Sequence, residues 1–104
     1  MSKLSKEYQN YIVSSNTLKM GTVLERINKF LFVESIYDKI DKDTNTKLNN
    51  LIKQCKHYLG KGYVNKAVYD FDEIFDILQG IAPENCTFGY HEYNGTNLGF
   101  WKLD

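Results

Sequence analysis

The chain has 104 residues, 42% of them hydrophobic and 14% aromatic, so it can bury a core of its own as one domain over residues 1–104. Disordered chains are poor in aromatic residues, and no stretch approaches the ~20 apolar residues of a membrane span, so both classes are excluded. The absence of an apolar secretion signal and the presence of only two cysteines favour a cytoplasmic protein of a bacterial host, with reduced thiols.

The formal net charge is zero, yet the charges are distributed unevenly along the chain. Residues 1–66 hold twelve Lys and Arg against six Asp and Glu, whereas residues 67–104 hold one against seven. Residues 44–69 contain no carboxylate at all. This asymmetry indicates two oppositely charged surfaces and bears on what the protein binds.

Hydrophobic periodicity predicts an α+β fold with about four helices followed by a C-terminal β-hairpin packed on the helical body. The first helix is expected on the apolar stripe Leu4, Tyr8, Tyr11 and Ile12. The second is expected to begin at Thr22, which forms a capping-box pattern with Glu25. Its apolar stripe continues through Val23, Ile27, Phe30, Leu31, Tyr37 and Ile40.

Two further helices are predicted in the middle of the chain. A third helix, capped by Asp43 or Thr44, is expected to end at Gly60 in a left-handed conformation. The fourth has the clearest helical spacing in the chain, with Val64, Val68, Phe71, Phe75 and Leu78 separated by four, three, four and three residues.

The C-terminal part is rich in the aromatic residues that strands prefer. Residues 86–91 and 98–101 are expected to pair as a hairpin, with the Asn94-Gly95 pair as its tight turn. Phe88 and Phe100 are predicted to face inward, because an isolated hairpin is marginal in water and must cover a core.

Side chains that could support catalysis or hold a metal are few and poorly spaced. The histidines His57 and His91 and the cysteines Cys55 and Cys86 lack the short paired spacings of zinc sites. Cys55 and His57 are two residues apart on a predicted helix, so they do not face each other. We therefore expect no enzyme activity, no cofactor and no metal site.

Binding to a partner protein is the function that we expect. The acidic row, defined as Asp70, Asp72, Glu73 and Asp76, could register against a basic surface, although an ordinary solvated helix face has the same pattern. The aromatic tail group, defined as Tyr90, Tyr93 and Trp101, would supply interface anchors if exposed.

Binding to nucleic acid is the alternative. Lysines interleaved with aromatic residues can follow a phosphate backbone, and one stretch of the chain has this character. This basic segment comprises Lys53, Lys56, His57, Lys61 and Lys66. The chain has almost no Arg, the residue preferred for bidentate base contacts, so a solvated helix face opposite the apolar stripe is the simpler interpretation.

Residues 82–101 run from an Ala-Pro pair through Phe88-Gly89-Tyr90-His91 to Gly99-Phe100-Trp101. This ending resembles that of many short phage and mobile-element proteins, which close on a similar aromatic and glycine-rich segment after a helix. The chain departs from that pattern in the turn, where Tyr93-Asn94 replaces a glycine-acid pair. The resemblance carries no activity and implies a phage, prophage or plasmid accessory protein.

Small accessory proteins of such origin often bind and inhibit host machinery. The leading hypothesis is therefore a non-enzymatic inhibitor of a host protein, such as a CRISPR effector or another defence enzyme. A small nucleic-acid-binding protein and a toxin-immunity protein are the alternatives, a homodimer is possible, and no membrane association is expected.

Overall fold

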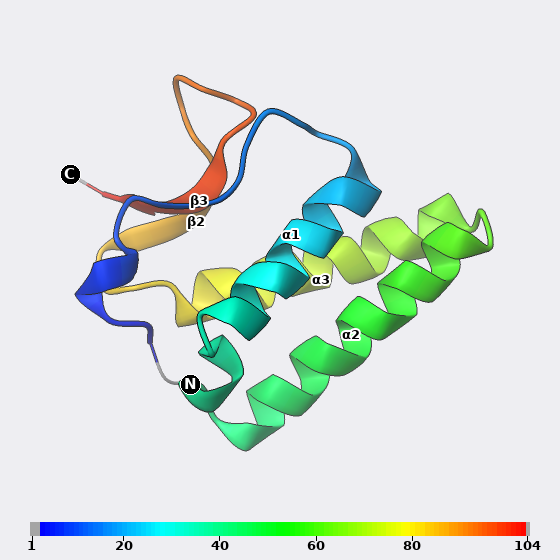
Figure 1. The fold of residues 1–104 in the computed structure, drawn as a ribbon, viewed down its shortest axis with the longest axis horizontal. Coiled ribbons are helices and arrows are strands. Elements are labelled where there is room, and N and C mark those ends of the chain that lie inside the picture. Colours follow the sequence, from blue (N-terminus) through cyan, green and yellow to red (C-terminus); the bar gives the residue numbers. More distant parts are fainter. Residues whose placement is uncertain (1–2, 104) are drawn as a thin grey trace.

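The computed structural model describes residues 3–103 and shows an α+β fold (Figure 1). The helices of this part of the chain are α1 Met20–Val33, α2 Lys42–Gly60 and α3 Val64–Ile81. Short 3-10 turns, η1 Lys6–Tyr8 and η2 Ile36–Asp38, precede β1 and α2. The strands β1 Tyr11–Ser14, β2 Cys86–Tyr90 and β3 Leu98–Lys102 form one antiparallel sheet in the order β1-β3-β2.

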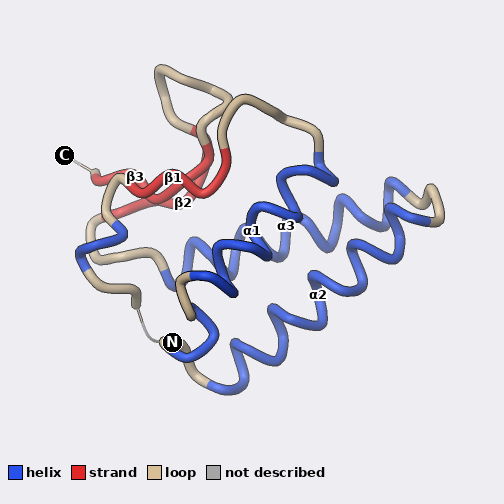
Figure 2. Tube along the Cα trace, viewed as in Figure 1, coloured by secondary structure: helices blue, strands red, loops and turns tan. Residues whose placement is uncertain are grey.

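The helices α2 and α3 form a long antiparallel hairpin (Figures 1 and 2). The sheet lies near the C-terminal end of α3, away from the α2–α3 turn, and packs on both α1 and α3. The inner face of the sheet carries Phe88 and Phe100, both buried as the sequence predicts. The Phe100 ring lies 5.8 Å from that of Phe30 on α1, and the Phe88 ring lies 5.1 Å from that of Phe75 on α3. These aromatic contacts join the sheet to both helices.

The predicted N-terminal helix is wrong, because this segment pairs with the C-terminal hairpin. Asn10 has a positive φ of 58°, which ends the short turn, and residues 11–14 then pair with β3. The rings of Tyr8 and Tyr11 pack on Phe30, at 5.9 and 5.2 Å. Ile12, expected on the apolar stripe of a helix, is instead 48% exposed. Long-range pairing has overridden a helical pattern that spans only two turns.

The boundaries of α1 also differ from the prediction. The helix begins at Met20, so Thr22 lies inside its first turn and caps nothing, and it ends at Val33. Ser35 then adopts a left-handed conformation with φ 53°. Tyr37 and Ile40 therefore lie beyond the helix, although Ile40 still reaches the core.

The predicted caps Asp43 and Thr44 lie inside α2, and Asp41, the residue before the helix, caps it instead. Its carboxylate accepts hydrogen bonds from the Thr44 backbone N–H at 3.1 Å and from the Thr44 hydroxyl at 2.8 Å. These bonds lower the pKa of Asp41. At the other end, Gly60 is the last helical residue, and Gly62 takes the left-handed conformation with φ 78°.

The hairpin between β2 and β3 is confirmed, but its connection is a seven-residue loop over residues 91–97 rather than a tight turn. His91 donates its backbone N–H to the Asn97 carbonyl at 2.7 Å, and the Asn94 side chain accepts from the Thr96 hydroxyl at 3.0 Å. The Asn97 backbone N–H also donates to the Asn94 carbonyl at 3.0 Å, so Asn94 and Gly95 lie in a turn inside the loop and do not join the two strands directly.

Candidate functional site

The two oppositely charged segments lie next to each other but neutralise each other at only one point. Within residues 3–103, the one ion pair joins Lys47 Nζ of α2 to Glu73 Oε2 of α3 at 3.2 Å, and both side chains are exposed. An exposed pair of this kind contributes little to stability. The carboxylate-free residues 44–69 cover α2 from its first turn, the α2–α3 turn and the start of α3, whereas the acidic row begins in the second turn of α3.

The members of the acidic row lie in three different surroundings. Asp70 is 8% exposed, and its Oδ2 atom has no hydrogen-bond partner in the described part of the chain. Glu73 points to Lys47. Asp72 and Asp76 are exposed one turn apart on α3 and make no ion pair within the described residues. Only these two aspartates are therefore available together for a partner.

The aromatic tail group is divided between two faces of the sheet, because successive side chains of a strand point to opposite sides. Tyr90 lies on the inner side, with its ring 6.1 Å from that of Phe75. Trp101 lies on the outer side, where its ring is 4.6 Å from that of His91 and its Nε1 donates to the Gly89 carbonyl at 2.7 Å. Tyr93, in the loop, is 87% exposed. The three residues cannot act as one anchor.

A continuous surface nevertheless joins Asp72 and Asp76 to Tyr90. The connection is made by two half-buried rings of α3, Phe71 and Phe75, whose centroids are 4.8 Å apart. Each phenylalanine is followed directly by one of the aspartates. We name this surface, made of Phe71, Asp72, Phe75, Asp76 and Tyr90, the α3–β2 face.

The α3–β2 face is held in place by Gln79. Its side-chain oxygen accepts hydrogen bonds from the Phe88 backbone N–H at 2.9 Å and from the Thr87 hydroxyl at 2.7 Å. These bonds fix β2 against α3 and satisfy a donor at the edge of the sheet. Phe71 and Phe75 belong to the apolar spacing that predicts the fourth helix. Such spacing does not distinguish a buried ring from one that the short strand β2 leaves half exposed, so the sequence did not reveal this surface.

The basic segment is exposed along α2 and around the α2–α3 turn. Lys66, at the start of α3, places its Nζ 5.6 Å from the ring centroid of Tyr58 and 5.5 Å from that of Tyr63. The His57 ring lies 5.9 Å from that of Tyr58. The turn therefore presents positive charge together with aromatic rings, and its own sequence contributes no carboxylate.

Cys55 and His57 lie on α2, Cys86 lies on β2, and His91 lies in the β2–β3 loop. Cys55 is buried between α2 and α3, with its Sγ 3.4 Å from the Ala67 carbonyl oxygen. Burial, assisted by the negative charge of Asp70, raises the pKa of the Cys55 thiol to about 11, so it is protonated at neutral pH and is not a nucleophile. His57 is exposed on α2, whereas His91 lies in the β2–β3 loop.

Residues 3–103 contain no group of three His, Cys, Asp or Glu side chains close enough to hold a metal ion. The helices of this described region are also too short or too polar to cross a membrane.

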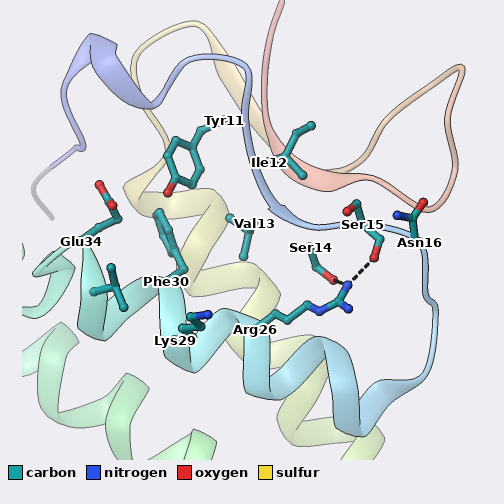
Figure 3. Close-up of a pocket in the computed structure, with 11 residues that line it drawn as sticks. Tyr11, Ile12, Val13, Ser14, Ser15, Asn16, Arg26, Lys29, Phe30 and Glu34 are labelled. Atoms are coloured by element: carbon teal, nitrogen blue, oxygen red, sulfur yellow. Dashed lines mark hydrogen bonds between the residues drawn. The ribbon is translucent and has the colours of Figure 1, made fainter.

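The structure also has a groove that was not predicted from the sequence. A groove of about 380 Å³ lies between β1 and α1 and is lined by residues of both elements (Figure 3). It was missed because residues 11–14 were predicted as helix, and the groove exists only when this segment is a strand at the edge of the sheet.

Comparison with known proteins gives no relative: no family model, no curated protein and no solved structure matches the chain.

The burial of Asp70 predicts a stability that depends on pH. Desolvation, with a further contribution from Glu73, raises the pKa of Asp70, so the folded state binds its proton more tightly than the unfolded state. Stability therefore falls as the pH rises through the raised pKa and stays lower above it. We expect Asp70→Asn to stabilise the protein at pH 7 by about 1 kcal/mol, with the gain shrinking toward pH 3.

Urea unfolding of the two proteins at pH 7 and at pH 3.5 measures this difference. Asp72→Asn, which removes an exposed charge from the same helix, should change stability far less. A less stable Asp70→Asn variant at pH 7 would show that the buried carboxylate has a favourable partner.

Proposed function

We propose that the protein works by binding another protein, without catalysis, and that the α3–β2 face is its contact surface. The observation that carries this proposal is the continuity of half-buried aromatic rings with two exposed aspartates on that face. Aromatic side chains dominate the binding energy of protein interfaces, and charged groups surround them at the rim.

The charges of this face select the class of partner. Asp72 and Asp76 favour a basic surface, because opposite charges speed the encounter and fix the register of a complex. Enzymes that handle nucleic acids have basic grooves for the phosphate backbone. Together with the phage-like C-terminal residues, this supports an inhibitor from a mobile element that occludes a host protein in the bacterial cytoplasm, such as a CRISPR effector or another defence enzyme.

Reversing both charges should weaken partner binding while leaving the fold intact. We expect the double variant Asp72→Lys/Asp76→Lys to recover at least tenfold less of the partner captured by the unmodified protein, since attraction at two rim positions becomes repulsion. Both side chains are exposed, so the melting temperature should change by only a few degrees. The measurement is quantitative affinity capture from the native host, with mass spectrometry of the bound proteins.

A matched control reverses two exposed carboxylates elsewhere, in the variant Glu7→Lys/Glu84→Lys. It changes the net charge by the same amount and should retain the partner. Equal capture by the two double variants would remove the acidic residues from the interface.

Nucleic-acid binding is a second candidate, favoured by one specific observation. Lys66 lies over two tyrosine rings at the α2–α3 turn, within a stretch that contains no carboxylate. Lys53, Lys56 and Lys61 belong to the same stretch, are exposed and make no ion pair among the described residues. Such a surface could follow a single strand electrostatically, with tyrosine as a stacking platform.

This candidate predicts an affinity for a 12-residue oligo-dT that falls linearly with the logarithm of salt concentration, measured by fluorescence anisotropy. We expect Lys61→Glu/Lys66→Glu to reduce the slope by about 0.7 for each phosphate that the variant no longer neutralises. The control Lys3→Glu/Lys42→Glu changes the charge equally at exposed positions outside the turn. Equal effects of the two variants, or no binding at low salt, would dismiss the candidate.

A further inference from the structure

The strand β1 has a neighbour on one side only. In the sheet order β1-β3-β2 it pairs with β3, and its other side borders the groove above α1 (Figure 3). The outer side of an edge strand presents backbone N–H and C=O groups at the spacing of a second strand. An extended chain is the natural occupant of such a position, because it satisfies those groups by adding to the sheet.

The edge is irregular in its pairing and is tied to α1 by Arg26. The register with β3 is irregular between Ile12 and Ser14, and Val13 and Ser14 both point toward α1, as in a β-bulge (Figure 3). The Arg26 guanidinium donates hydrogen bonds to the Ser15 carbonyl and, at 3.4 Å, to the Ser14 hydroxyl. A strand fixed in this way loses little conformational entropy when it binds.

The groove has apolar surface between two oppositely charged ends. Val33 of α1, 62% exposed, contributes apolar surface opposite β1, and the buried Phe30 lies at the base of the groove. Arg26 and, one turn later, the exposed Lys29 carry positive charge toward the Ser14 end. Glu34 carries negative charge at the Tyr11 end. Its carboxylate accepts a hydrogen bond from the Tyr8 hydroxyl at 3.3 Å, and this contact fixes its position.

We propose that this groove binds an extended, singly acidic peptide segment of a partner protein, which adds as a fourth strand beside β1. Its carboxylate lies near Arg26 and Lys29, and apolar side chains two or more residues away, on the same side of the peptide, cover the exposed Val33. Glu34 repels a second carboxylate at the other end, so charge fixes the register of the peptide. This site is separate from the α3–β2 face and does not depend on the function proposed for that face.

Fluorescence anisotropy with synthetic probes tests the proposal. The probe is a labelled peptide of sequence Val-Thr-Asp-Thr-Val-Thr-Val, which places Asp and three Val side chains on one side of the strand. It is blocked at both ends, and its counterpart carries Lys in place of Asp. We expect the acidic peptide to bind and the Lys peptide to bind roughly tenfold more weakly, as attraction becomes repulsion.

The backbone contacts are tested with two N-methylated isomers of the acidic peptide, one methylated at odd positions and one at even positions. Only one set of amides can face β1, because alternate backbone groups of a strand point to opposite sides. One isomer should lose about tenfold or more in affinity through its missing hydrogen bonds, and the other should bind normally.

Charge exchange in the protein completes the test. Lys29→Glu should abolish the preference for the acidic peptide, because the charge at this end of the groove changes from +2 to zero while Arg26 remains. Lys53→Glu, an equal charge change at an exposed position of α2, should leave the preference unaltered. Asp72→Lys/Asp76→Lys should also bind the acidic peptide normally, which separates this proposal from the function assigned to the α3–β2 face.

Three results would overturn the proposal. They are no binding of the acidic peptide at about 1 mM, equal affinity for the acidic and Lys peptides, and equal affinity for the two N-methylated isomers. Sedimentation that shows a dimer broken by Lys29→Glu would assign the groove to a second copy of the chain instead.

Discussion

Replacing Gly99 by alanine is expected to destabilise the protein by about 3 kcal/mol, a large effect for the addition of one methyl group. Gly99 lies in the central strand, paired with Ile12 on one side and with Gly89 on the other. A Cβ at this position would overlap the Tyr11 carbonyl oxygen and would lie 3.2 Å from Ile12 Cα. These atoms belong to the backbone, so relief requires β1 to move away from β3.

The matched control is Gly89→Ala, because a Cβ at Gly89 meets nothing within 4 Å. Thermal unfolding should show a decrease of at least about 12 °C for the Gly99 variant, since 1 kcal/mol corresponds to about 4–8 °C in a domain of this size. The Gly89 variant should stay within a few degrees of the unmodified protein. Similar melting temperatures for both variants would show that β1 does not approach Gly99 closely.

Replacing Phe100 by alanine is expected to cost about 3–5 kcal/mol, the range for a large aromatic residue in a packed core. Phe100 is fully buried, and its ring lies 5.8 Å from that of Phe30 and 5.0 Å from that of Phe88. Its removal would leave a cavity where the sheet meets α1. The remaining stability should be small, because domains of this size are stabilised by only about 5–15 kcal/mol in total.

Phe32→Ala is the appropriate control, because it deletes the same side-chain atoms at a position of α1 that is 78% exposed, where no cavity is left in the core. Denaturant unfolding should give a change below about 0.5 kcal/mol for this variant. A comparable loss for both phenylalanines would mean that the exposed face of α1 is covered, for example by a second copy of the chain.

The predictions from sequence that the structure confirms are those based on local patterns. Helices were expected around residues 44–60 and 64–78, and α2 and α3 lie there, because apolar spacing and capping residues act within a few turns of one helix. The hairpin and the inward direction of Phe88 and Phe100 follow from strand alternation over short distances. The α+β class was accessible for the same reason.

Other parts of the prediction failed where contacts between distant segments determine the local conformation. Residues 11–14 have an apolar pattern compatible with a helix, yet they form a strand, because pairing with β3, more than eighty residues away, satisfies their backbone groups. The groove above α1 depends on that pairing and was therefore missed.

The sequence likewise identified some residues of the candidate binding surfaces, but the tertiary structure determines which of them are exposed together. Charge patterning identified the acidic row, but only packing of α3 against α2 determines that Asp70 is buried while Asp72 and Asp76 stay exposed. Composition identified the aromatic tail group, but the sheet sends Tyr90 and Trp101 to opposite faces. A one-dimensional pattern gives the type and spacing of side chains, whereas their exposure depends on which distant surface covers them.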